Sequence, residues 1–193
     1  LVLEATEMGD ILDLAKVEHR TGTESSAMTG EPSAARDYQP LNMQAVTHCF
    51  ALEHVDGTHT IDRPADYDRW RQATLPGWRN PLLSWTYPNP RTGVPVTGRF
   101  EPNSDEEVKD MQTALLAPEL WTYRRVLDRR NFVPGLLSSD VTIVNWPMND
   151  YAEGVVFAGE DDMKHRAQAK DLGLAFLYWM QTEAPRADGG TGY

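Results

Sequence analysis

The sequence predicts an α+β fold, with a mixed or antiparallel sheet of short strands and one long buried helix. Prolines recur between residues 74 and 104 and exclude long helices there, while the β-branched and aromatic residues around them favour short strands. Residues 160–184 instead repeat apolar side chains near helical spacing and stop before Pro185. A strand–turn–helix piece, a β-rich region and a long helix with a returning segment are therefore expected at residues 1–22, 23–158 and 159–193.

The opening pattern combines a short apolar run at residues 1–3 with Gly9-Asp10 and a periodic apolar segment at residues 11–16. Asp10 suits the N-cap of a helix, and Gly9 lets a ligand or another backbone approach because it has no Cβ. The first N–H groups of such a helix point outward and favour an anion such as a phosphate. A structural turn without a ligand is the commoner meaning of this pattern taken alone.

The middle of the chain favours several strands. One is predicted at residues 17–22, before a loop that extends to residue 40. Residues 41–55 are the first long stretch that suits a core, and they include the strand-favouring Val46, Thr47, Cys49 and Phe50. A helix is expected at residues 64–70, and further strands are expected at residues 82–87, 94–100, 119–132 and 141–146.

The long helix is expected within residues 159–186, with Glu160, Asp161 and Asp162 in its N-terminal turn, because negative charge is favourable at a helix N-terminus. Its second half, residues 172–180, is apolar on nearly all sides, which predicts deep burial. Pro185 cannot continue a helix and marks its end.

Composition and charge exclude several classes of protein. The net charge of −11 argues against nucleic-acid backbones and anionic membrane surfaces as partners. No apolar run reaches the ~20 residues of a membrane span, and a cytoplasmic protein is expected. The single cysteine, Cys49, lies in an apolar run, which favours a buried, inert thiol. No spacing of His and Cys predicts a metal site, and no hydrolase or nucleoside-triphosphatase motif occurs.

The segment from Asn145 to Tyr151 is the sharpest candidate for chemistry. It continues from a predicted buried strand, which ends at Pro147, where a loop is expected to begin. Asn145 and Asn149 can each donate and accept hydrogen bonds. Tyr151 is a candidate donor or proton carrier that Asp150 could orient. The competing interpretation is an ordinary Asn-Asp turn next to a tryptophan that anchors the core.

Gln44, Thr47 and His48 place polar groups in an otherwise apolar strand. Gln44 and His48 are an even number of residues apart, so both side chains would lie on the same face of a regular strand. Two arrangements explain these polar side chains: they line a cavity, or they lie on the solvent-exposed face of an edge strand. His48 is the candidate for proton transfer, since imidazole titrates near neutral pH.

Arg124 is a candidate ligand for a carboxylate or a phosphate, together with its neighbour Arg125, because guanidinium groups bind such anions in a bidentate way. A solvated or ion-paired strand face explains the same arginines.

The stretch "LEATEMGD" resembles the second flavin-contacting segment of FAD-dependent oxidoreductases of the glutathione-reductase-like superfamily. That segment typically reads Asp-Ala-Thr, one or two variable residues and Gly-Asp. Glu4 replaces the usual Asp, and Ala5, Thr6, Gly9 and Asp10 match. The chain looks most like a bacterial branch whose substrates are mostly unassigned. Similar stretches continue in order at residues 41–52, 60–68, 120–132, 140–151 and 174–193.

The resemblance implies the substrate-side region of a flavoenzyme with FAD as cofactor and a small organic molecule as substrate. Ala5, Thr6, Gly9 and Asp10 would contact the flavin. His48 and Tyr151 would be catalytic. Substrate-binding roles are implied for Gln44, Asn145, Asn149 and Arg124.

Members of this family begin with a Rossmann unit that carries Gly-x-Gly-x-x-Gly, and no such pattern occurs in this chain. The chain is therefore expected to be an internal segment, with the Rossmann portion elsewhere in the parent chain or in a partner subunit. The alternative is a non-enzymatic binding module, for instance for carbohydrate, with which six Trp and seven Tyr are compatible. Such a module would expose its tryptophans and would not need the long apolar helix.

Overall fold

The structure is a computed structural model that describes residues 3, 5–6, 9–89, 91–105, 118–157 and 161–193. Small antiparallel sheets and one long helix make the fold mixed α+β, which confirms the predicted class. The chain forms two compact units, Leu1–Ala45 with Ala152–Arg166, and Val46–Tyr151 with Ala167–Tyr193. The three parts expected from the sequence stay a prediction. Residues 1 and 2, Glu4 and Glu160, on which some expectations depended, lie outside the described residues.

The first unit holds the opening turn and little regular structure. Helix α1 spans Asp10–Leu14, and helix α2 spans Ser26–Thr29. The strand predicted at residues 17–22 is wrong, because this exposed segment pairs with no other described strand. Pairing starts only at Thr23, which forms a bridge with Gln39.

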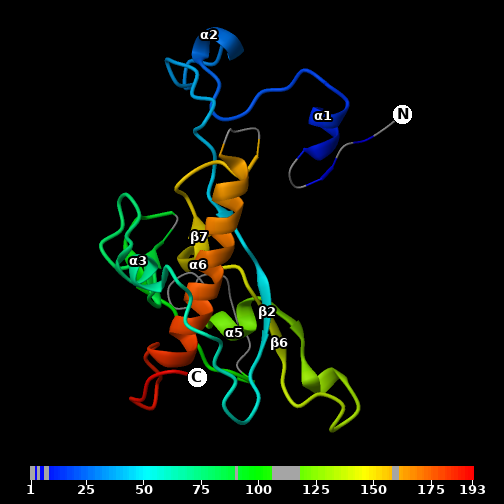
Figure 1. The fold of residues 1–193 in the computed structure, drawn as a ribbon, viewed down its shortest axis with the longest axis vertical. Helices are drawn as coiled ribbons and strands as arrows, with labels where there is room; N and C mark the ends of the chain where they lie inside the picture. The colour runs from blue at the N-terminus through cyan, green and yellow to red at the C-terminus, as the bar shows by residue number, and fades with distance from the viewer. Residues whose placement is uncertain (1–2, 4, 7–8, 90, 106–117, 158–160) are drawn as a thin grey trace. The chain divides into compact units, whose positions relative to one another are not determined.

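The described residues of the second unit form three small antiparallel sheets, parts of which are visible in Figure 1. In the largest, strand β6 (Val141–Val144) lies between β2 (Phe50–Glu53) and β5 (Arg125–Leu127). The two others pair β1 (Val46–Thr47) with β7 (Asp150–Tyr151), and β3 (Thr86–Pro88) with β4 (Pro95–Thr97).

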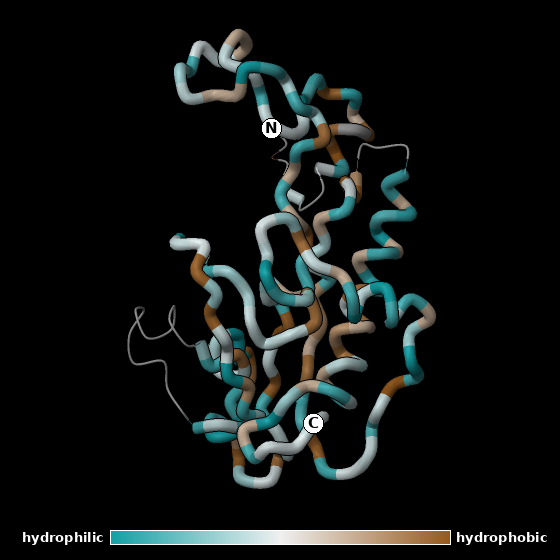
Figure 2. Tube along the Cα trace, turned by 90° about the vertical axis from the view of Figure 1, so that its left-hand side faces the viewer, coloured by the Kyte–Doolittle hydropathy of each residue, from teal (hydrophilic) through white to brown (hydrophobic). Residues whose placement is uncertain are grey.

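Helix α6, Asp162–Thr182, is the long helix that the sequence predicts. Figure 2 shows the helix changing from teal at its start to tan and brown further along. Phe176 packs edge-to-face on Trp85 and Trp146, with ring centroids 6.1 and 5.9 Å away. Burial is one-sided rather than complete, since Leu174 is 39% exposed. The buried positions of α6 are Ala169, Leu172, Gly173, Ala175, Phe176, Trp179 and Met180.

Two predicted strands are interrupted in the structure. The strand expected at residues 119–132 begins instead with helix α5, Leu120–Tyr123, because the Glu119 carboxylate caps that helix. It accepts from the backbone N–H groups of Trp121 and Thr122, at 3.1 and 2.7 Å. The strand expected across residues 41–55 divides into β1 and β2. The helix expected at residues 64–70 is present as α3, but it begins and ends later, at Tyr67–Gln72.

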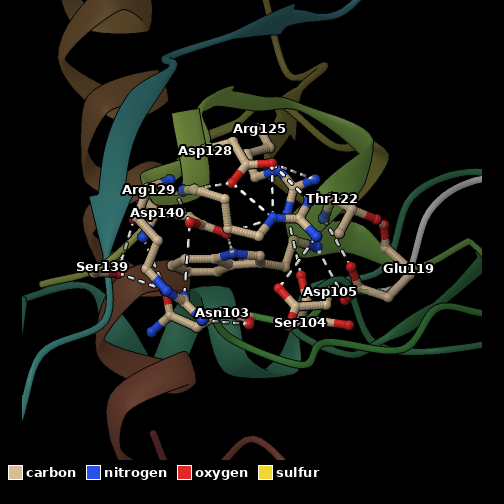
Figure 3. A network of polar contacts seen from close by, with 12 residues as sticks. Asn103, Ser104, Asp105, Glu119, Thr122, Arg125, Asp128, Arg129, Ser139 and Asp140 are labelled. Carbon is tan, nitrogen blue, oxygen red and sulfur yellow. Dashed lines mark hydrogen bonds and ion pairs between the residues drawn. The ribbon is translucent and has the colours of Figure 1, made fainter. Parts of the chain in front are cut away.

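A polar network fixes the loop between β5 and β6 (Figure 3). Asp140, 1% exposed, accepts hydrogen bonds from Arg125 Nη1 at 3.1 Å and from the backbone N of Arg129 at 2.9 Å. Asn103 joins the network because its Oδ1 accepts from the backbone N of Asp140 at 2.8 Å. Arg125 therefore serves as an internal ion-pair partner. Within the described parts of the chain, no helix is long and apolar enough to cross a bilayer.

Candidate functional site

The opening corner of the chain lies in the first unit and is open to solvent. Ala5, Thr6 and Asp10 are exposed, and Gly9 is half-buried with φ +63°. Asp10 is the first helical residue of α1 rather than its N-cap. The side chain of Thr6 takes the capping role, since its Oγ1 accepts from the backbone N of Asp10 at 3.1 Å. A ligand can therefore approach all four predicted flavin-contacting residues.

The second unit brings most of the other predicted residues together. Two antiparallel ladders end close to one another: Thr47 pairs with Asp150 in the first, and Phe50 pairs with Val144 in the second. His48 and Cys49 therefore face the longer segment 145–149, whose extra residues form the 3₁₀ helix η2, Pro147–Asn149. We call this region the β1–β7 junction; it comprises residues 47–49, Arg124 and residues 145–150.

His48 is exposed at the junction, and helix α6 lies directly behind it. A Cβ on Gly173 of α6 would lie 3.3 Å from the carbonyl oxygen of His48 and 3.7 Å from its ring atom Cδ2. The helix can approach this closely because Gly173 has no side chain. Gln44 is also exposed, but it belongs to the first unit, and the structure does not place it with His48.

Asp150 and Arg124 supply the charges of the junction. Thr47 Oγ1 donates to Asp150 Oδ1. Burial raises the pKa of the Asp150 carboxyl, while the hydrogen bond from Thr47 and the charge of Arg124 oppose this rise. Arg124 is exposed, and its carbonyl oxygen accepts from Ile143 N of β6 at 3.0 Å. Its backbone is thus fixed, and its guanidinium lies over the exposed ring of Tyr123, 5.2 Å from the ring centroid.

Cys49 is exposed, so the expectation of a buried thiol is wrong. The break between β1 and β2 leaves it outside the paired strands, where its Sγ donates to the carbonyl of Thr47 at 3.6 Å. Partial burial raises the pKa of the Cys49 thiol, and the charge of Arg124 only partly offsets this rise. The protonated thiol, which is the less reactive form, therefore predominates at neutral pH.

The segment 145–149 carries buried hydrogen-bond donors. Asn149 is 0% exposed, and its Oδ1 accepts from the backbone N of Trp146 at 3.0 Å. Asn149 Nδ2 and Trp146 Nε1 are both buried, and neither has a hydrogen-bond partner among the described residues. An acceptor oxygen from a water or a ligand would satisfy such groups. Asn145, next to them, is half-buried.

Tyr151 lies on the inner side of this segment. It is 1% exposed, its hydroxyl donates to Gln168 Oε1 at 2.7 Å, and its ring packs edge-to-face on Trp70 at 6.1 Å. Tyr151 thus connects β7 to helices α6 and α3.

A cavity of about 90 Å³ at the other end of β2 was not expected from the sequence. His54 and His59 both line it, although their spacing predicts no site. The residues that enclose it come from distant parts of the chain, so no local pattern could reveal it. No group of His, Cys, Asp and Glu able to hold a metal ion occurs in the part of the chain that the structure describes.

Comparison with known proteins identifies a family. A family model described as FAD dependent oxidoreductase matches residues 1–192. No curated protein and no solved structure matches the chain.

Proposed function

The chain belongs to the FAD dependent oxidoreductase family, whose model covers residues 1–192, and on that premise we propose that it is an internal segment of an enzyme that oxidises a small organic substrate. FAD is the cofactor of this family and, when bound, supplies the acceptor for a hydride. The observation that carries the proposal beyond the family is the β1–β7 junction, which gathers His48, Arg124, Asn145 and Asn149 around one irregularity of the sheet.

The opening corner fits FAD, because Gly9 has no Cβ and Ala5, Thr6 and Asp10 are exposed, as a segment that lies against a dinucleotide requires. We therefore assign Ala5, Thr6, Gly9 and Asp10 to FAD contact. A Rossmann portion of the parent chain or of a partner subunit would hold the rest of the dinucleotide.

The junction residues would bind the substrate and accept its proton. As a substrate loses a hydride from carbon, His48 would take the proton from the attached hydroxyl or amine, which leaves a carbonyl or imine product. Arg124 would bind an anionic group of the substrate, and Asn145 and Asn149 would orient its polar atoms. The substrate-binding role of Gln44 stays a prediction, because Gln44 belongs to the first unit. The catalytic role of Tyr151 stays a prediction. Its hydroxyl donates to Gln168, so that role requires one of the two side chains to move.

The packing of the tryptophans favours this function over carbohydrate binding. Trp70, Trp85, Trp121, Trp146 and Trp179 are all buried, and Trp78 is half-buried. A carbohydrate-binding module presents such rings to solvent, where they stack on sugars. The long helix α6 is also part of the core rather than an accessory to a sandwich.

The test uses the full-length protein, reconstituted with FAD and mixed anaerobically with a panel of small alcohols, amines and 2-hydroxy acids. Bleaching of the visible flavin absorption identifies a substrate. We expect His48→Gln to keep the FAD spectrum and to slow bleaching about 10²–10⁴-fold, the usual contribution of a general base. His19→Gln, an exposed histidine of the first unit, is the control and should bleach at the wild-type rate. A His48→Gln enzyme as fast as wild type would remove His48 from the mechanism, and a protein that never retains FAD would remove the proposal itself.

A further inference from the structure

The cavity at the end of β2 is separate from the β1–β7 junction. Cys49 precedes β2 and His54 follows it, so the two sites are separated by the length of that strand, about 13 Å at about 3.3 Å per residue. The cavity lies between the end of β2, the last turns of α6 and the loop at residues 54–61. Its lining residues are Leu52, Glu53, His54, Val55, Gly57, His59, Phe100, Trp121, Leu177, Met180, Gln181 and Tyr193.

The apolar part of this lining consists of buried and half-buried side chains. Trp121 and Phe100 are 0% and 3% exposed, and their rings pack edge-to-face with centroids 5.7 Å apart. Met180 of α6 is 2% exposed. Leu52, Val55 and Leu177, all half-buried, complete the apolar side. Apolar walls with a few hydrogen-bonding groups are typical of small-molecule sites.

Most polar groups of the lining already hold the walls in place. Gln181 fastens the loop to α6, since its Oε1 accepts from Ile61 N at 3.0 Å and its Nε2 donates to the carbonyl of His59 at 2.9 Å. The hydroxyl of Tyr193 donates to the carbonyl of Phe100 at 2.8 Å. Their hydrogen-bonding capacity is used for structure, so they define the shape of the cavity more than its chemistry.

His54 differs from these residues. Its backbone is held on both sides, because its N donates to Ser139 Oγ at 3.0 Å and its carbonyl accepts from Asn103 Nδ2 at 3.3 Å. Its imidazole makes no hydrogen bond with any described residue. His54 therefore offers a free donor and acceptor on a fixed backbone at the edge of an apolar cavity.

The cavity also lacks a fixed charge that would select an ion. Among the described residues, no Lys or Arg lines it, and Glu53 is the only side-chain carboxylate in its lining. Strand alternation turns the side chain of Glu53 to the face opposite that of Leu52. A permanently charged ligand would lose its hydration here without gaining an opposite charge.

We propose that this cavity binds a small, uncharged organic molecule, with a branched apolar body and one hydroxyl group that hydrogen-bonds to His54. The cavity volume is about 90 Å³, which exceeds the roughly 10–15 Å³ that one water needs. It is below the roughly 150 Å³ of a cavity that holds benzene, so the ligand is limited to a few heavy atoms. The site is independent of flavin chemistry at the junction.

The test uses isobutanol, isobutylamine and isobutyrate, which share one apolar body and differ in charge. Binding to the full-length protein is followed by NMR of ¹³C-methyl methionine. Met180 lines the cavity and reports on it, while the fully buried Met148, outside the lining, is the internal control. We expect isobutanol to shift the Met180 signal saturably with a millimolar Kd, and the two charged probes to bind more weakly.

Two variants complete the test. His54→Leu keeps the size of the side chain and removes the hydrogen bond, so isobutanol should bind about tenfold more weakly. Val55→Trp should fill the cavity and abolish the shift. The proposal is overturned if isobutanol does not shift Met180 saturably, if the charged probes bind as well as isobutanol, or if His54→Leu binds it as tightly as wild type. Because His54 is exposed, its replacement should not impair folding.

Discussion

Removing the carboxylate of Asp140 should lower the stability of the second unit more than any exposed charge change. Asp140→Ala deprives Arg125 Nη1 and the backbone N of Arg129 of their acceptor. It also breaks the ion pair with Arg129 Nη1, at 3.6 Å. Breaking a buried ion pair by removing one partner typically costs about 3–5 kcal/mol.

The lower end of that range applies here. Arg125 keeps a second carboxylate, Asp128, with its Nη2 at 3.2 Å from Asp128 Oδ2, and the side chain of Arg129 is 30% exposed. A loss of about 3 kcal/mol corresponds to a fall in Tm of about 6–12 °C for a protein of this size. Asp140→Asn retains an acceptor oxygen but no charge, so its Tm should lie between those of wild type and Asp140→Ala.

Thermal unfolding followed by circular dichroism measures these shifts. Asp68→Ala is the matched control, because Asp68 pairs with Arg63 at 2.5 Å but is 73% exposed. Surface pairs of this kind contribute at most about 1 kcal/mol, so the Tm of Asp68→Ala should stay within about 3 °C of wild type. The reasoning is refuted if Asp140→Ala unfolds at the same temperature as Asp68→Ala.

Two further predictions concern the junction and the first unit. Burial raises the pKa of Asp150, so the folded state binds its proton more tightly than the unfolded state, and stability falls as the pH rises through the window between the two pKa values. Asp150→Asn should therefore raise Tm at pH 7 but not in acid, below both pKa values; equal shifts at both pH values would contradict this. Gly22→Ala, with φ +76° and a Cβ 2.1 Å from the carbonyl oxygen of Gln39, should speed proteolysis of the loop at residues 23–40. Gly30→Ala, with the same φ and nothing within 4 Å of its Cβ, is the control, and equal cleavage of the two variants would refute steric crowding as the cause.

Local sequence patterns predicted the structure well where the residues of a single element determine its secondary structure. The acidic start, the apolar second half and Pro185 together predicted α6, and the apolar run before Pro147 predicted β6. The strand expected at residues 119–132 is shortened to β5, because the Glu119 side chain caps helix α5 at the start of this range. The strand predicted at residues 17–22 is wrong because no described strand pairs with this segment, and no local pattern encodes a partner strand.

The site shows the same division. Residue types alone identified His48, Arg124 and the segment 145–149 as separate candidates, but the apolar run around Cys49 wrongly predicted a buried thiol. The pairing of Thr47 with Asp150 and of Phe50 with Val144 brings the separate segments together and leaves Cys49 outside the sheet. The cavity beside His54 depends on contacts between β2, α6 and the last residue of the chain, Tyr193.

The sequence by itself determined the family, through the order of short stretches such as "LEATEMGD", together with the fold class and the position of the long helix. The tertiary structure alone decided how the junction is assembled, which donors are left without partners, and where the cavity beside His54 opens. Motifs and helical periodicity are properties of neighbouring residues, so they can be read along one chain. Strand register, burial and cavities are set by residues far apart in sequence, whose meeting depends on the free energy of the whole packed unit.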